Sequence, residues 1–172
     1  MQKLDIRDIK KALGVHMRVS ETERLLLEGV DLVGPVHFDL KLTNAGSRIL
    51  VEGIVEATAR VQCARCVETF DLHEKIDIHE EFLPSGSEEL PKGPDLHPEE
   101  LSVFIYDEDR IDIEEVIRQN IIAALPIQPL CRPDCGGLCT VCGVNRNETP
   151  CQCETKTVDP RWKGLEKFIQ KP

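Results

Sequence analysis

The sequence predicts an α+β fold, with a β-rich antiparallel domain at the N-terminus, one main helix, and a cysteine-rich module after the helix. Three observations predict it. Apolar and polar residues alternate through much of the first half, one later stretch repeats apolar residues at helical spacing, and six of the eight cysteines lie within residues 130–153. Because only 4% of the 172 residues are aromatic, aliphatic side chains must build the core.

The β-rich domain is expected to span residues 1–83. Apolar and polar side chains alternate cleanly in residues 35–43, as they do in a strand with one buried face. Residues 48–62 are rich in β-branched side chains, and residues 70–82 again keep one alternating phase. The run CARC lies between those last two strands, so we expect a hairpin whose tip carries two cysteines.

A loop and a helix follow the predicted sheet. Residues 84–104 form an acidic, proline-rich loop or linker, because this composition cannot build a core of its own. Residues 105–129 contain a helix that packs on the β-domain. Asp112 and Glu115 resemble a capping box at its start, and Pro126 ends it. The helix carries one apolar stripe, formed by Ile113, Val116, Ile117, Ile121, Ala124 and Leu125.

Cysteine spacing predicts a metal-binding module over residues 130–157, followed by a tail over residues 158–172. Cys139 and Cys142 are separated by two residues and followed by glycine, which is typical of a zinc knuckle, and Cys151-x-Cys153 follows. The hairpin pair and the pair after the helix complete a second set of four. The module is therefore zinc-ribbon-like, and we predict about two zinc ions held by Cys63, Cys66, Cys131, Cys135, Cys139, Cys142, Cys151 and Cys153.

The spacing leaves one alternative pairing open, in which Cys131, Cys135, Cys139 and Cys142 share a single ion. Disulfides are disfavoured because residues 1–20 carry scattered charges and no signal peptide, and no stretch is apolar enough to span a membrane. We therefore expect a cytoplasmic protein with reduced thiols and no membrane contact. The cysteine spacing that ends at Cys142 is also that of the iron–sulfur motif of radical SAM enzymes. Those enzymes are large barrels, and the chain has no room for a barrel after Cys142.

The sequence predicts no catalytic site. The five histidines stand apart without metal or triad spacing, and neighbouring carboxylates do not share a face. Zinc sites filled by four cysteines leave no position for a reactive water. We therefore expect that the protein is not an enzyme.

Charge is distributed unevenly along the chain. Residues 67–115, called here the acidic belt, contain seventeen acidic and three basic residues, a net charge of −14, whereas the whole chain carries −10. Residues 1–20 are net basic, as are residues 154–172. The acidic belt would repel phosphate and attract a basic partner, although a solvated acidic face is the simpler alternative.

Four runs give the chain a resemblance to a known family. They are CARC after a β-run, ALPIQPLC at the helix end, CGGLCTVCGVNRNETPCQC, and DPRWKGLEKF. Together they resemble the YceD family, the large ribosomal RNA subunit accumulation proteins, from about Val55 to Phe168. The resemblance implies a non-enzymatic factor of bacteria or plastids that supports accumulation of 23S ribosomal RNA.

Combining the resemblance with the charge pattern gives an expected partner. The acidic belt suits a basic large-subunit ribosomal protein or a pre-ribosomal particle, and the basic termini are the candidate contacts to ribosomal RNA. We expect an assembly factor that works through a protein contact. A zinc ribbon that binds RNA directly is the alternative, and a structural subunit of another complex is a third class.

Overall fold

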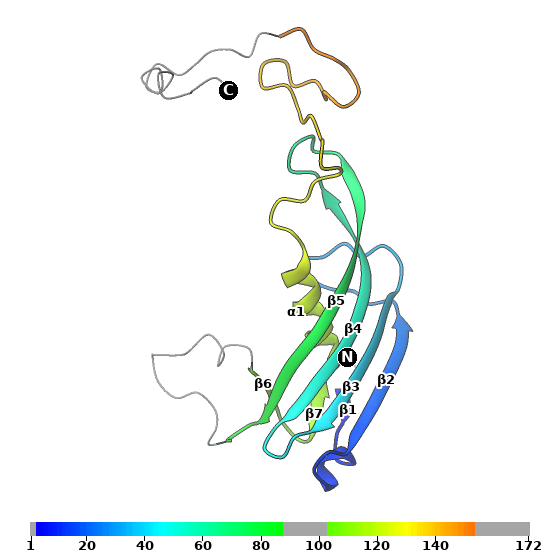
Figure 1. The fold of residues 1–172 in the computed structure, drawn as a ribbon, viewed down its shortest axis with the longest axis vertical. Helices are drawn as coiled ribbons and strands as arrows, with labels where there is room; N and C mark the ends of the chain where they lie inside the picture. Colours follow the sequence, from blue (N-terminus) through cyan, green and yellow to red (C-terminus); the bar gives the residue numbers. More distant parts are fainter. Residues whose placement is uncertain (1–2, 88–102, 154–172) are drawn as a thin grey trace, which may run out of the picture. The chain divides into compact units, whose positions relative to one another are not determined.

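The computed structural model describes residues 3–87 and 103–153 (Figure 1). Two compact units are present. One consists of residues 1–61 and 69–129, and the other of residues 62–68 and 130–172. The second unit thus combines the turn of a hairpin with the segment that follows the helix. Most of the expected linker and all of the expected tail lie outside the described residues.

A five-stranded sheet forms the first unit, in the order β2-β3-β4-β5-β6. Its strands are β2 (His16–Glu23), β3 (Val36–Asn44), β4 (Ile49–Gln62), β5 (Thr69–Pro84) and β6 (Val103–Tyr106). β3, β4 and β5 confirm the three strands that the alternating pattern predicts. β3 pairs with β2 and with β4 in antiparallel register, whereas β6 runs parallel to β5. A second, two-stranded sheet pairs β1 (Lys3–Asp5) with β7 (Arg110–Asp112) in antiparallel register.

The helix α1 (Ile113–Ala124) confirms the single main helix of the predicted fold class. Asp112 caps it, because its side chain accepts a hydrogen bond of 3.1 Å from the backbone N–H of Glu115. The expected capping box is only half formed. The carboxylate of Glu115 instead accepts hydrogen bonds from Arg118 and Gln119, one helical turn further along.

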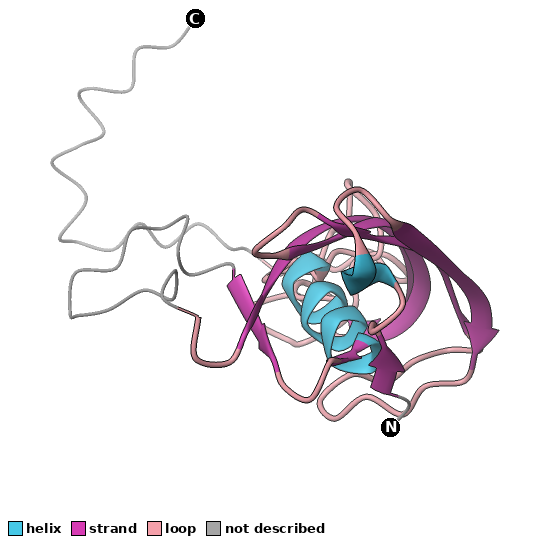
Figure 2. Ribbon diagram, turned by 90° about the horizontal axis from the view of Figure 1, so that it is seen from below, coloured by secondary structure: helices cyan, strands magenta, loops and turns pink. Residues whose placement is uncertain are grey.

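The core lies between α1 and the inner face of the sheet, which curves around the helix (Figure 2). On β3 every second residue is buried, in agreement with the strand period of two. The helix buries one face against them, formed by Ile113, Val116, Ile117 and Ile121. The sheet and α1 therefore make one aliphatic core, as expected from the scarcity of aromatic residues.

Two residues allow the close packing of the sheet. Gly53 lies opposite Leu40 with φ of +154°, and a Cβ atom there would stand 2.0 Å from the carbonyl oxygen of Asp39. Asn44 is buried, but its side chain donates to the carbonyl oxygens of Ile9 and Ala12 at 3.0 Å each. Its hydrogen bonds are thus satisfied inside the core, which is the condition for burying an amide.

Candidate metal centre

The structure gathers all eight cysteines into two groups of four. In each group the four sulfur atoms lie within 4.8 Å of one another. The first group comprises Cys63, Cys66, Cys131 and Cys135, and the second comprises Cys139, Cys142, Cys151 and Cys153. This is the two-set pairing considered from the sequence, and not the alternative in which the four cysteines from 131 to 142 share an ion.

Sulfur spacing in the first group fits a tetrahedral ion. The Sγ atoms of Cys63 and Cys135 are 3.8 Å apart, and those of Cys66 and Cys131 are 3.7 Å apart. Both distances far exceed a disulfide bond of about 2.05 Å, and all eight cysteines are free thiols. A tetrahedron with zinc–sulfur bonds of about 2.3 Å has edges of about 3.8 Å. The donor set therefore fits one four-coordinate ion with no open position.

In each group, one cysteine pair lies on a turn of the same type. In the first, the backbone N–H of Cys63 donates to Glu68 at 2.8 Å, and Val67 donates back to Cys63 at 3.0 Å. In the second, Cys139 donates to the carbonyl of residue 144 at 2.8 Å, and Gly143 donates back to Cys139 at 2.8 Å. The two turns are thus equivalent knuckles with the same hydrogen-bond register.

One position distinguishes the two knuckles. Gly143 has φ of +74°, a conformation that glycine adopts without steric penalty. The equivalent residue of the first knuckle is Val67, with φ of +65°. A β-branched residue rarely adopts this conformation, because its Cβ approaches the following carbonyl oxygen. The first knuckle therefore holds backbone strain that the second does not.

Asn147 supports the first group although it is not a ligand. Its Nδ2 donates to the Sγ atom of Cys135 at 3.3 Å, while its Oδ1 accepts from the backbone N–H of Gly136 at 2.8 Å and from Arg132 at 2.7 Å. Such contacts orient a thiolate and reduce its charge. The sequence pattern does not predict this role, and its one signal is the asparagine pair on either side of Arg146 in the run NRN.

Arg65 holds the segment after Cys135 against the CARC turn. Its guanidinium donates to the carbonyl oxygen of Cys135 at 3.1 Å, and its own carbonyl accepts from the N–H of Leu138 at 3.0 Å. Gly137 lies against this carbonyl with φ of +67°, and a Cβ atom would stand 3.1 Å from it. Gly137 therefore allows the backbone after Cys135 to pass close to the CARC turn.

The second group is local and more open. Cys139 is buried, Cys142 is exposed, and the other two cysteines are half-buried. The backbone N–H of Val141 points at the Sγ atom of Cys139, 3.5 Å away. The sulfurs of Cys139 and Cys151 raise the pKa of Arg146, so this cation lies beside the thiolates and partly offsets their charge.

The thiol pKa values show why each group suits a cation. Backbone hydrogen bonds at Cys131 and Cys66 lower the pKa of Cys63 to about 6, and those at Cys142 and Val141 lower the pKa of Cys139 to about 5. One sulfur in each group is therefore readily a thiolate.

In each group another thiol has a pKa that is raised. Burial and the neighbouring sulfurs raise the pKa of Cys131 to about 12, and the Cys142 sulfur together with burial raises the pKa of Cys153 to about 12. Four thiolates in so small a volume repel one another. A divalent cation removes this repulsion, so both groups fit a metal ion as ligand sets. Metal binding by the eight cysteines stays a prediction.

Within the described residues, the mixed sheet, the helix α1 and the two four-cysteine groups define an α+β protein with two candidate metal sites. Residues 51–169 match the family model described as large ribosomal RNA subunit accumulation protein YceD. The match covers more than half of the chain, so the chain belongs to the YceD family. Membership supports a role in the biogenesis of the large ribosomal subunit.

The chain is also similar to proteins of mycobacteria and maize, and the maize protein carries the family name. An uncharacterised protein of Mycobacterium tuberculosis is 31% identical over 157 residues, covering 90% of this chain and 73% of the relative. An uncharacterised protein of Mycobacterium leprae is 28% identical over 171 residues, covering 96% and 76%. The chloroplastic large ribosomal RNA subunit accumulation protein YCED homolog 1 of Zea mays is 29% identical over 147 residues, covering 72% of this chain and 50% of the maize protein. No solved structure matches the chain.

The remaining predictions meet the structure only in part. No helix among the described residues is long and apolar enough to cross a membrane. The family run DPRWKGLEKF and the last residues of the expected module lie outside the described residues. Within residues 105–129 the structure adds two strand segments before the helix, in β6 and β7, which the sequence pattern does not predict.

Proposed function

We propose that the chain is a non-enzymatic cytoplasmic factor that supports accumulation of 23S ribosomal RNA by binding a basic protein of the large ribosomal subunit. Two structural zinc ions hold its cysteine module in shape. The observation that carries the proposal is the acidic belt, whose net charge of −14 exceeds that of the whole chain. Such a charge attracts a basic protein at long range and repels the phosphates of RNA.

The cations of the cysteine module support a protein partner over direct RNA binding. Arg132 donates to Asn147 and lies 3.6 Å from the carboxylate of Asp134. Arg146 lies beside the second sulfur group, and Arg65 donates to a backbone carbonyl. These guanidinium groups already have partners within the module, so they are poorly placed to bind phosphates. Contact with RNA would instead use the basic residues near the two chain ends, which is the alternative function.

Charge neutralisation in the acidic belt tests the partner. Asp107 and Asp109 of the acidic belt stay unchanged in the test variant because both have structural partners. Asp109 pairs with Lys10, and Asp107 accepts a hydrogen bond from Ser85. The variant carries Gln at Glu88, Glu89, Glu99 and Glu100. A control variant removes the same charge outside the acidic belt, with Gln or Asn at Glu28, Asp31, Glu52 and Glu148.

The two variants are expressed in cells that lack the chain, and large-subunit RNA is measured. The proposal expects the belt variant to restore less RNA than the control. In a pull-down at low salt the belt variant should also recover less basic ribosomal protein, and this difference should shrink as salt rises. Direct RNA binding expects the reverse, because removing repulsive charge leaves RNA affinity intact or raises it. Full restoration by a stable belt variant would refute the protein contact.

Metal content is a separate test of the site. Elemental analysis of the reduced protein is expected to give about two zinc ions per chain, since each structural site takes four thiolates. One ion or none would contradict the two-site proposal. Iron accompanied by visible absorbance would replace zinc with an iron centre.

A further inference from the structure

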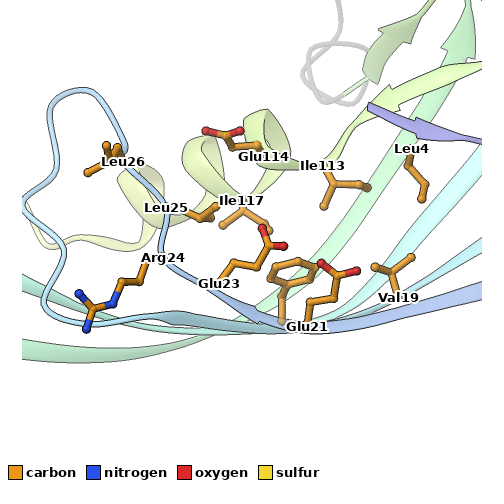
Figure 3. A pocket seen from close by; sticks show the side chains of 11 residues that line it. Leu4, Val19, Glu21, Glu23, Arg24, Leu25, Leu26, Ile113, Glu114 and Ile117 are labelled. Carbon is orange, nitrogen blue, oxygen red and sulfur yellow. The ribbon is translucent and has the colours of Figure 1, made fainter. Parts of the chain in front are cut away.

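A cavity of about 430 Å³ opens in the first unit between the β2 end of the sheet and the start of α1 (Figure 3). Its floor is apolar and includes Val19, Phe38 and Ile117, while its rim carries the carboxylates of Glu21, Glu23 and Glu114. This volume falls in the range of ligand sites, which also combine an apolar floor with a few polar groups. We call it the β2 pocket.

The register of β2 explains why two carboxylates face the core side of the sheet. Glu21 pairs with Phe38 and Glu23 pairs with Val36, both of which are buried on the inner face. Side chains at every second position share one face of a strand. The two glutamates therefore take positions that the inner face would otherwise fill with apolar side chains.

These carboxylates have no cation of their own in the described part of the chain. The side chain of Arg24 extends away from Glu21 and Glu23 (Figure 3). A hydrogen bond with Glu21 and their mutual repulsion raise the pKa of Glu23. Like charges held this close leave a site that a positive group would stabilise.

Two further features suit the β2 pocket to a peptide segment rather than to a single side chain. β2 is the last strand of its sheet, and within residues 3–87 and 103–153 no strand pairs with its outer edge. An unpaired edge can accept an extended peptide through backbone hydrogen bonds. Leu26, 96% exposed at the rim, adds an apolar contact surface beside the pocket.

We propose that the β2 pocket binds an extended segment of a basic protein, which adds to the edge of β2 and places an apolar side chain on Phe38. Lysine or arginine residues two positions before and after that apolar residue share its face, and their long side chains pair with Glu21 and Glu23. The inference rests on the proposed function, because it gives the basic partner a docking site that shares only Ile113 and Glu114 with the acidic belt and contains none of the residues changed in the belt variant.

Another account of these glutamates makes a different prediction. Inward-pointing charges on an edge strand also prevent sheets from joining edge to edge. In that case the glutamates protect β2 and the pocket has no affinity for basic peptides. Their removal would then cause self-association of the chain rather than loss of peptide binding.

The test uses the full chain and two short fluorescent peptides of equal lysine content. One peptide has leucine at its centre with lysine two positions before and after it, and the other has serine in place of the leucine. Test variants are Glu21→Gln with Glu23→Gln, and Leu26→Ser. A matched control, Glu52→Gln with Asp77→Asn, removes the same charge from exposed positions on the outer face of the sheet.

The leucine peptide is expected to bind the chain more tightly than the serine peptide and to shift amide NMR signals of β2 and of the first turn of α1. The paired glutamine variant should weaken binding by about fivefold, the combined effect of two exposed ion pairs. Leu26→Ser should also weaken binding, and the outer-face control should leave it unchanged.

Equal binding of both peptides, or equal losses in the glutamine variant and its control, would overturn the proposal and indicate general charge attraction. Self-association of the glutamine variant without loss of peptide binding would assign the glutamates to edge protection. Measuring large-subunit RNA in cells distinguishes failure of the pocket from failure of the proposed function. If the glutamine variant restores large-subunit RNA while the belt variant does not, the pocket fails and the proposed function stands. If the chain is not needed for that RNA, the proposed function fails whatever the peptides do.

Discussion

Strain at Val67 gives a prediction whose size follows from the structure. The substitution Val67→Gly removes a Cβ atom from a backbone with φ of +65°. Relief of this conformation stabilises the folded turn by about 1–2 kcal/mol. The greater freedom of glycine in the unfolded chain offsets about 0.4–1 kcal/mol of that gain. Val67 is 49% exposed, so little apolar burial is lost. The net expectation is a gain of about 1 kcal/mol in the folded first knuckle.

This gain should appear as metal affinity. Folding of a metal module and metal binding are coupled, so a knuckle that is about 1 kcal/mol more stable binds its ion about fivefold more tightly. The assay is a competition titration with a zinc chelator, made in a Cys151→Ser chain in which only the first group remains complete. The matched substitution Gly143→Val introduces the strain in the second knuckle. By the same balance it should weaken that group by about fivefold, measured in a Cys63→Ser chain.

The result that would refute the reasoning is specific. Unchanged or weaker affinity in Val67→Gly would show that the valine side chain stabilises the knuckle by contacts that outweigh its backbone strain. If both substitutions lower metal affinity, the strain argument fails for the first knuckle and holds for the second. A gain in the first and a loss in the second would confirm that the two turns are equivalent.

Three further predictions concern the cysteine groups and the helix start. Cys63→Ser should raise amide exchange through the β4–β5 hairpin as well as the module, whereas Cys151→Ser should raise it only in the C-terminal segment, and equal effects would contradict two separate groups. Asn147→Ala should weaken metal binding in the first group by about 10- to 100-fold in the same competition titration, with the second group unchanged. Hydrogen bonds from Arg118 and Gln119 lower the pKa of Glu115 from 4.5 to about 2, so its stabilisation is present above about pH 4.5 and is lost as the pH falls towards 2. Thermal midpoints of the wild type and Glu115→Gln should therefore converge over that range, and a constant difference would show that this carboxylate's charge is not involved.

The three central strands, the helix and the two-residue cysteine spacings can be predicted from the sequence because each depends on neighbouring residues. Alternation places one face of β3 in the core, and the apolar stripe does the same for α1. The second cysteine group also closes within a short run, so spacing predicts it as one of two possible sets of four. Local patterns of this kind persist whatever the rest of the chain does.

The edge strand β2 shows where such patterns stop. Met17 and Val19 begin an apolar phase, but Glu21 and Glu23 occupy its next two positions and hide the strand from the pattern. Its neighbours, not its own residues, decide that it is a strand, because pairing with β3 supplies the backbone hydrogen bonds. β6 is similar, since its four residues are defined by parallel pairing with β5.

By itself the sequence determined that this protein has a β-rich core, one amphipathic helix and cysteines spaced for metal. Tertiary structure alone decided which cysteines meet, because the sulfurs of Cys63 and Cys135 are separated by 72 residues of chain and their contact depends on the whole course of β5 and α1. It also decided that Asn147 reaches a ligand sulfur and that two glutamates surround an apolar cavity. The physical reason is the same in each case. Spacing along a chain predicts contacts within a turn or a strand, whereas contacts between distant segments depend on how the complete core packs.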